Sequence, residues 1–113
     1  MSDSIAALTA EIQNFVDARE WRKYHNPKDL SVAIAAEAGE LMRHFVWQQE
    51  DQIAQRVAAR RDEIASEIAD VGILLFELAD NLGLSLGAVM AAKIANNDVR
   101  YPVEKSRDRK SVV

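Results

Sequence analysis

The chain has 113 residues, enough for one domain, and its 49% hydrophobic and 28% charged residues are typical of a folded globular protein. Cysteine is absent, which excludes disulfides, zinc–thiolate centres, iron–sulfur clusters and a cysteine nucleophile. The net charge of −4 argues against a nonspecific nucleic-acid binder or a membrane-surface protein. Because no apolar stretch reaches membrane-spanning length and the first residues lack the basic region of a signal peptide, we expect a cytoplasmic protein.

Apolar residues recur at helical spacing in four segments, and no alternating strand pattern competes with them. The break at Asn26-Pro27 separates the first segment from the second, whose N-cap is expected at Asp29 or Ser31. Scarce Gly and Pro argue against a turn-rich β-sandwich. We therefore predict an all-α, four-helix bundle-like protomer, with helices at about residues 4–20, 30–48, 61–81 and 86–100.

The last two helical segments carry end signals. Gly83 suits the position just after the third helix, and Ser85 can cap the fourth, which stops before Pro102. A polar stretch over residues 49–62 separates the second segment from the third, and its central part can be helical. We expect one domain over residues 1–103 and a charged, flexible tail over 104–113.

The second helical segment is apolar nearly all round. A helix of this kind is usually buried on more than one face, and a small domain does not easily bury such a helix alone. We therefore predict a homo-oligomer with the second and third helices at the interface; the alternative is a central helix within a monomer. The apolar residues are Ile34, Ala38, Leu41 and Phe45 on one side and Val32, Ala35, Met42 and Val46 on the other.

Two acidic pairs stand inside apolar helix, Glu37 with Glu40 and Glu67 with Asp70. Residues at i and i+3 share one helix face, about 5–6 Å apart. Glu63, one turn earlier, joins the second pair. Both pairs hold the same angular position beside the apolar stripe of their helix. If the two helices pack together, the four carboxylates can converge on one site.

Clustered carboxylates repel one another, and a divalent cation removes that repulsion. An all-oxygen ligand set favours a hard ion, Mg²⁺ or Mn²⁺, which keeps positions open for substrate phosphates. A single acidic pair would be an ordinary solvated face, but two equivalent pairs make that interpretation weaker. A di-iron site expects Glu-x-x-His; here the i+3 positions are Glu40 and Asp70, which disfavours iron.

A second group of polar residues lies on the fourth segment, where Lys93, Asn97 and Arg100 share one face and Tyr101 is adjacent. Two cations and an amide on one face suit phosphate oxygens. By itself the same pattern also fits a solvated helix face, so both interpretations stay open.

Three ring side chains have two possible roles each. Trp21 and Trp47 lie near the ends of predicted helices, and an indole can stack on a nucleobase or simply fill a core. His44 lies on the carboxylate side of the second helix, where it is either a structural histidine or a group that supports the carboxylates.

Glu37-Ala-Gly-Glu40 followed by Glu67-Ile-Ala-Asp70 resembles the Glu-x-x-Glu and Glu-x-x-Asp motifs of the MazG-like, all-α nucleoside triphosphate pyrophosphohydrolases. The segments around Trp21 and Trp47 and the run from Lys93 to Val103 look like the dCTP pyrophosphatase branch of that family. The resemblance covers roughly residues 8–103. Ile12 and Leu74 depart from it, because some dCTP-preferring relatives have His and Tyr there.

The resemblance implies hydrolysis of a (deoxy)nucleoside triphosphate to a monophosphate and pyrophosphate, with Mg²⁺, by a homodimer or a tetramer built from dimers. House-cleaning of the nucleotide pool is the implied role. Related phosphoribosyl-ATP hydrolysis, or a non-catalytic helical oligomerisation module, is the alternative. The implied residues are Glu37, Glu40, Glu67 and Asp70 as metal ligands, with Glu37 or Glu40 acting on the attacking water; Lys93, Asn97, Arg100 and Tyr101 on the phosphates; and Trp21 and Trp47 at the base.

Overall fold

The computed structural model describes residues 4–107. Within this range the chain is helical and has no strand, which confirms the all-α fold class. The elements are α1 (Ile5–Ala18), the 3₁₀ turn η1 (Arg22–Tyr24), α2 (Pro27–Arg43), the 3₁₀ turn η2 (Glu50–Gln52), α3 (Ile53–Asn81), α4 (Leu86–Arg100) and α5 (Val103–Ser106).

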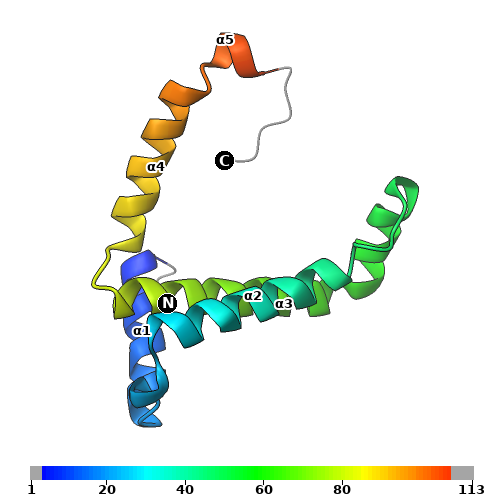
Figure 1. Ribbon diagram of the computed structural model, residues 1–113. Helices are drawn as coiled ribbons and strands as arrows, with labels where there is room; N and C mark the ends of the chain where they lie inside the picture. The colour runs from blue at the N-terminus through cyan, green and yellow to red at the C-terminus, as the bar shows by residue number, and fades with distance from the viewer. Residues whose placement is uncertain (1–3, 108–113) are drawn as a thin grey trace.

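Helices α2 and α3 form the body of the molecule (Figure 1). They lie side by side and run in opposite directions, and α1 crosses them at the end where α2 begins and α3 ends. From that same end α4 projects away from the pair and carries α5 at its tip. The body of one chain is thus built from three helices, with the fourth standing apart.

The Asn26-Pro27 pair starts α2. The Asn26 side chain accepts a hydrogen bond from the Asp29 backbone N–H at 2.9 Å, and Pro27 occupies the first turn, where its missing N–H costs nothing. The predicted caps, Asp29 and Ser31, are therefore wrong, because a better cap with a proline at N1 lies just before them. The helix also ends at Arg43 rather than near residue 48.

Helix α3 is longer than predicted, since it begins at Ile53 and not near residue 61. A capping box between Gln49 and Gln52 starts the chain into η2, and α3 follows directly. At Arg60 the backbone leaves helical values (φ −123°, ψ 24°), which kinks the helix. The polar stretch left open by the sequence is therefore mostly helix, made of a short arm before the kink.

A Schellman motif ends α3. Gly83 has φ 70°, the Leu84 N–H donates to the Ala79 carbonyl at 2.8 Å, and the Gly83 N–H donates to the Asp80 carbonyl at 3.0 Å. The predicted role of Gly83 is confirmed. Ser85 is the N-cap residue of α4, as predicted, although its side chain makes no capping hydrogen bond.

The core of one chain is small. Within residues 4–107 the buried apolar side chains are Val16, Leu30, Ile64 and Ala79, and none of them comes from α4. The radius of gyration is 17.1 Å, whereas a compact domain of this length has about 13 Å. The four long helices therefore do not close into a compact bundle within one chain.

Where the predicted tail begins, Val103–Ser106 form the short helix α5. Residues 108–113 of the predicted tail lie outside the described residues. Over residues 4–107, no single helix is long and apolar enough to cross a membrane; the bent pair Glu50–Asn81 and Leu86–Arg100 would qualify together by length and composition alone.

Candidate active site

The acidic pairs lie on the two helices that pack together. Glu37 and Glu40 belong to α2, and Glu67 and Asp70 belong to α3. Glu37 and Glu67 are half-buried, whereas Glu40 and Asp70 are exposed. The two helices thus bring both predicted pairs onto one body.

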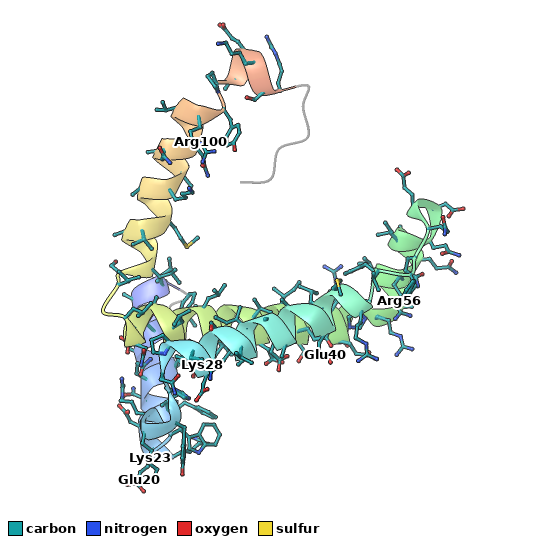
Figure 2. The ribbon with its side chains drawn as sticks, in the orientation of Figure 1. Glu20, Lys23, Lys28, Glu40, Arg56 and Arg100 are labelled. Carbon is teal, nitrogen blue, oxygen red and sulfur yellow. The ribbon has the colours of Figure 1, made fainter. Side chains whose placement is uncertain are left out.

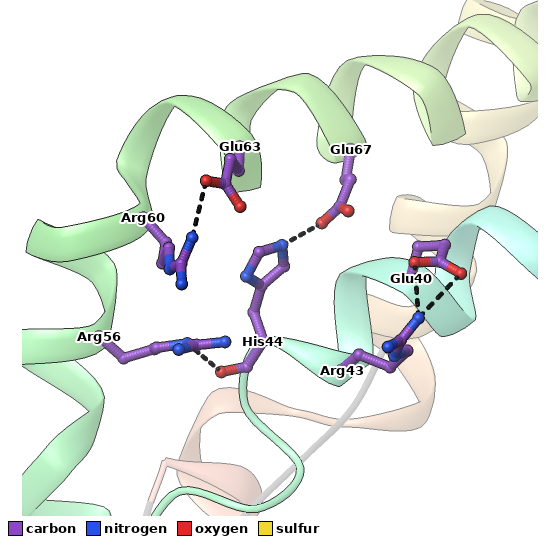
Figure 3. A network of polar contacts seen from close by, with 7 residues as sticks. All are labelled: Glu40, Arg43, His44, Arg56, Arg60, Glu63 and Glu67. Carbon is purple, nitrogen blue, oxygen red and sulfur yellow. Dashed lines mark hydrogen bonds and ion pairs between the residues drawn. The ribbon is translucent and has the colours of Figure 1, made fainter.

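The carboxylates do not form a closed metal cage: among residues 4–107, no three or more His, Cys, Asp or Glu side chains are grouped closely enough to hold a metal ion. Two of the carboxylates, those of Glu40 and Glu67, lie against basic side chains (Figure 3). Arg43 Nη1 lies 3.2 Å from Glu40 Oε2, and His44 Nε2 lies 2.5 Å from Glu67 Oε2.

The same network continues toward the kink in α3. Arg56 Nε donates to the His44 carbonyl at 3.0 Å, and Arg60 Nη1 donates to Glu63 Oε1 at 3.0 Å. Glu63, expected beside Glu67, is therefore paired with an arginine on its own helix. The short arm of α3 before the kink places Arg56 against the turn after α2, and sequence periodicity gave no sign of this contact.

The predicted phosphate-binding residues lie elsewhere. Lys93, Asn97 and Arg100 are on α4, and Tyr101 follows it; Lys93 and Arg100 are exposed, and Asn97 is 8% exposed. The Arg100 guanidinium carbon lies 5.3 Å from the centre of the Tyr101 ring. Figure 2 shows Arg100 on the projecting helix, far from Glu40 on α2. One chain does not bring the two predicted sets together.

The two tryptophans are also separated. Trp21 precedes α2 and stacks edge-on against Phe15, with ring centres 5.7 Å apart. Trp47 follows α2 and is 84% exposed, so it is not a core residue of this chain. A helix of 17 residues, about 25 Å long, stands between them. They cannot enclose one base within a single chain.

An apolar cavity of about 560 Å³ lies between α1 and α3. Glu77 lies at its wall and is only 9% exposed. Burial raises the pKa of Glu77, and the nearby His25 opposes this shift. Sequence reasoning missed this cavity, although its apolar residues recur at helical spacing. They include Leu8, Ile12, Phe15, Ile73 and Phe76.

The family to which the chain belongs follows from sequence comparison. The model of the MazG-like family matches residues 32–112, which include both acidic pairs, α3, α4 and α5. The chain is a member of the MazG-like family, as the motif resemblance indicated.

Individual relatives agree with this membership. The chain is 32% identical to dCTP pyrophosphatase 1 of Bos taurus over 107 residues and 31% identical to that of Homo sapiens; the matched region covers 93% of this chain. It spans 62% of the bovine protein and 61% of the human one. The crystal structure of a pyrophosphatase from Archaeoglobus fulgidus is similar, with a TM-score of 0.83, 33% identity, and coverage of 90% of this chain and 95% of that chain.

Proposed function

We propose that the protein is a Mg²⁺-dependent nucleoside triphosphate pyrophosphohydrolase that acts on deoxynucleotides and releases a monophosphate and pyrophosphate. The observation that carries this proposal is the pair of acidic i,i+3 motifs on the packed helices α2 and α3. Similarity to dCTP pyrophosphatase 1 over most of the chain supports it. The proposed role is house-cleaning of the cytoplasmic nucleotide pool.

The residues present suit a hard divalent cation. All four predicted ligands are carboxylates, the oxygen donors that a hard divalent cation prefers, and they lie on the two helices that pack together. We assign Glu37, Glu40, Glu67 and Asp70 as the residues that would hold Mg²⁺, with Mn²⁺ as a substitute. When bound, the ion supplies charge neutralisation for the triphosphate.

The chain's own groups would then carry out the remaining steps. Glu37 or Glu40 orients a water molecule and accepts its proton as the water oxygen forms a bond to the α-phosphorus. The bond from that phosphorus to the bridging oxygen breaks, and pyrophosphate leaves with its electron pair. Lys93 and Arg100 stabilise the charge on the pyrophosphate, and Asn97 and Tyr101 add hydrogen bonds to the phosphates.

This assignment requires a second copy of the chain, because α4 stands away from the carboxylates of its own chain. We propose a homodimer, or a tetramer built from dimers. The extended shape supports it, as do apolar side chains that one chain leaves exposed. Among these are Val32 and Met42 on α2, Ile68 and Ile73 on α3, and Ile94 and Val99 on α4.

The base would lie between Trp21 of one chain and Trp47 of another. Both indoles are at least 44% exposed and so are available for stacking. The nearby cavity is apolar at Ile12, where a histidine of some dCTP-preferring relatives would offer a polar contact.

Product analysis tests the proposal. The purified chain is incubated with each canonical dNTP and NTP, with Mg²⁺ or with EDTA, and the products are separated by chromatography. Monophosphate and pyrophosphate that form only with Mg²⁺ are the expected result. No turnover across the panel would contradict the proposal and direct attention to a phosphoribosyl substrate or to a non-catalytic module.

Glu67→Gln provides the matched variant for this assay. It removes the charge of a predicted ligand and keeps the size of the side chain. We expect turnover to fall by at least about a hundredfold, with the helical circular dichroism and the oligomer mass unchanged. Full activity of this variant would show that Glu67 is not a metal ligand.

A further inference from the structure

His44 occupies an unusual position in the network of Figure 3. It lies at the C-terminus of α2, where its N–H donates to the Leu41 carbonyl at 3.2 Å, and its own carbonyl accepts from Arg56 Nε at 3.0 Å. The backbone of this residue is thus held from two helices. Its side chain is 9% exposed and points across to α3, where Nε2 meets Glu67 Oε2 at 2.5 Å.

The second ring nitrogen of His44, Nδ1, bears on the role of this side chain. Nδ1 is buried and has no hydrogen-bond partner among the described residues. A buried histidine that serves only the fold is usually hydrogen-bonded through its nitrogens. Here the contact with Glu67 is the polar contact that the ring makes within residues 4–107.

The matching pair on α2 is different in kind. Arg43 and Glu40 are three residues apart on one helix, and their side chains are 72% and 51% exposed. Exposed pairs of this type contribute little and hold no fixed geometry. His44 and Glu67 come from different elements, and their side chains are 9% and 22% exposed. Of the two pairs, this one can fix the direction of a carboxylate.

We propose that His44 is a positioning residue for Glu67: by engaging Oε2 it orients the carboxylate so that Oε1 remains for the divalent cation. The inference rests on the proposed function, because it takes Glu67 as a metal ligand. Groups that contact a ligating carboxylate from behind commonly change metal affinity by about 10–100-fold when they are removed. His44 would do so without touching the substrate.

Mn²⁺ binding to the full chain, followed by calorimetry and by the electron paramagnetic resonance of free Mn²⁺, tests the proposal without relying on activity. His44→Leu places an apolar side chain in the buried position and is expected to weaken Mn²⁺ binding by about tenfold or more. His44→Gln places an amide nitrogen near the position of Nε2 and is expected to restore most of the affinity. The control is His25→Gln, which removes the other histidine of the chain and is expected to bind as the wild type does.

Two further variants keep the test decisive. If circular dichroism shows that His44→Leu does not fold, His44→Asn replaces it, because the shorter amide of asparagine does not reach Glu67. The proposal then requires that His44→Asn binds Mn²⁺ more weakly than His44→Gln does. In a Glu67→Gln background, His44→Leu is expected to have no additional effect, since the residue that it orients has lost its charge.

The outcomes separate the two proposals. Unchanged or tighter Mn²⁺ binding by His44→Leu, in a chain whose wild type binds Mn²⁺ and hydrolyses dNTPs, overturns the role of His44 alone. A wild type that neither binds Mn²⁺ nor hydrolyses any nucleotide overturns the proposed function and the role of His44 with it. Equal weakening by His44→Leu and His44→Gln would show that the ring matters for packing only, and this also overturns the positioning role.

Discussion

Two inactive variants of this protein should restore activity to each other when they are mixed. Glu67 lies 14 residues before the end of α3, and Arg100 lies 14 residues after the start of α4. Each is therefore about 21 Å along its helix from the turn that joins the two helices. The helices bend by 101° at that turn, so the two residues of one chain are roughly 30 Å apart. If both residues serve one site, as proposed, that site takes them from different chains.

The fraction of activity regained on mixing follows from the two-fold symmetry of the proposed dimer. Glu67→Gln and Arg100→Ala are each expected to lose about a hundredfold or more in turnover. After the two are dissociated, mixed equally and reassembled, half of the dimers are mixed. Each mixed dimer has one site with both changes and one with neither. The mixture should regain roughly a quarter of the wild-type rate, measured as pyrophosphate release with Mg²⁺.

A matched control separates this result from nonspecific recovery. Glu67→Gln mixed with Asp70→Asn combines two changes on the same side of the site, so every site in that mixture is defective. It should remain inactive. Recovery in the control as well, or no recovery in the first mixture, would refute the idea that α4 serves the carboxylates of another chain.

Three further predictions concern single positions. Folding raises the pKa of Glu77, so the protonated carboxyl adds stability at acidic pH that is lost as the pH rises through the folded-state pKa. Glu77→Gln should therefore raise the melting temperature at neutral pH but not at acidic pH. An equal change in melting temperature at both pH values would contradict the raised pKa of Glu77. Gly83→Ala should destabilise the fold by about 1 kcal/mol in denaturant titrations, because φ is 70° while the space around a Cβ is open; no change would mean that the turn relaxes. Trp47→Ala should raise KM by about tenfold through lost stacking, while the melting temperature of this 84% exposed position stays nearly constant; a loss of folding would make Trp47 structural.

Local signals in the sequence were enough to place much of the fold. The fourth helix has the predicted bounds, Leu86–Arg100, since a glycine suited to φ 70° and a capping position mark its start and Pro102 follows its end. The start of α3 was missed because residues 53–59 carry only two large apolar side chains, Ile53 and Val57, and hydrophobic periodicity is weak over so short a segment.

The candidate site was predictable in its residues more than in its geometry. Helical spacing groups Glu37 with Glu40 and Glu67 with Asp70, and the packing of α2 on α3 follows from their apolar stripes. A helical wheel carries no information on the register of two antiparallel helices. That register decides that His44 faces Glu67, and it became visible only with the turn after α2 in place.

The isolation of α4 within one chain has a consequence for how the protein behaves at different abundances. A helix of 15 residues that contributes no fully buried apolar side chain to its own chain is marginal in water. In the proposed oligomer, the folding of α4 and the association of chains are linked in one mass-action equilibrium. The dissociation constant of the assembly then sets the chain concentration around which hydrolysis per chain falls, so that the catalytic site is a property of the population of chains.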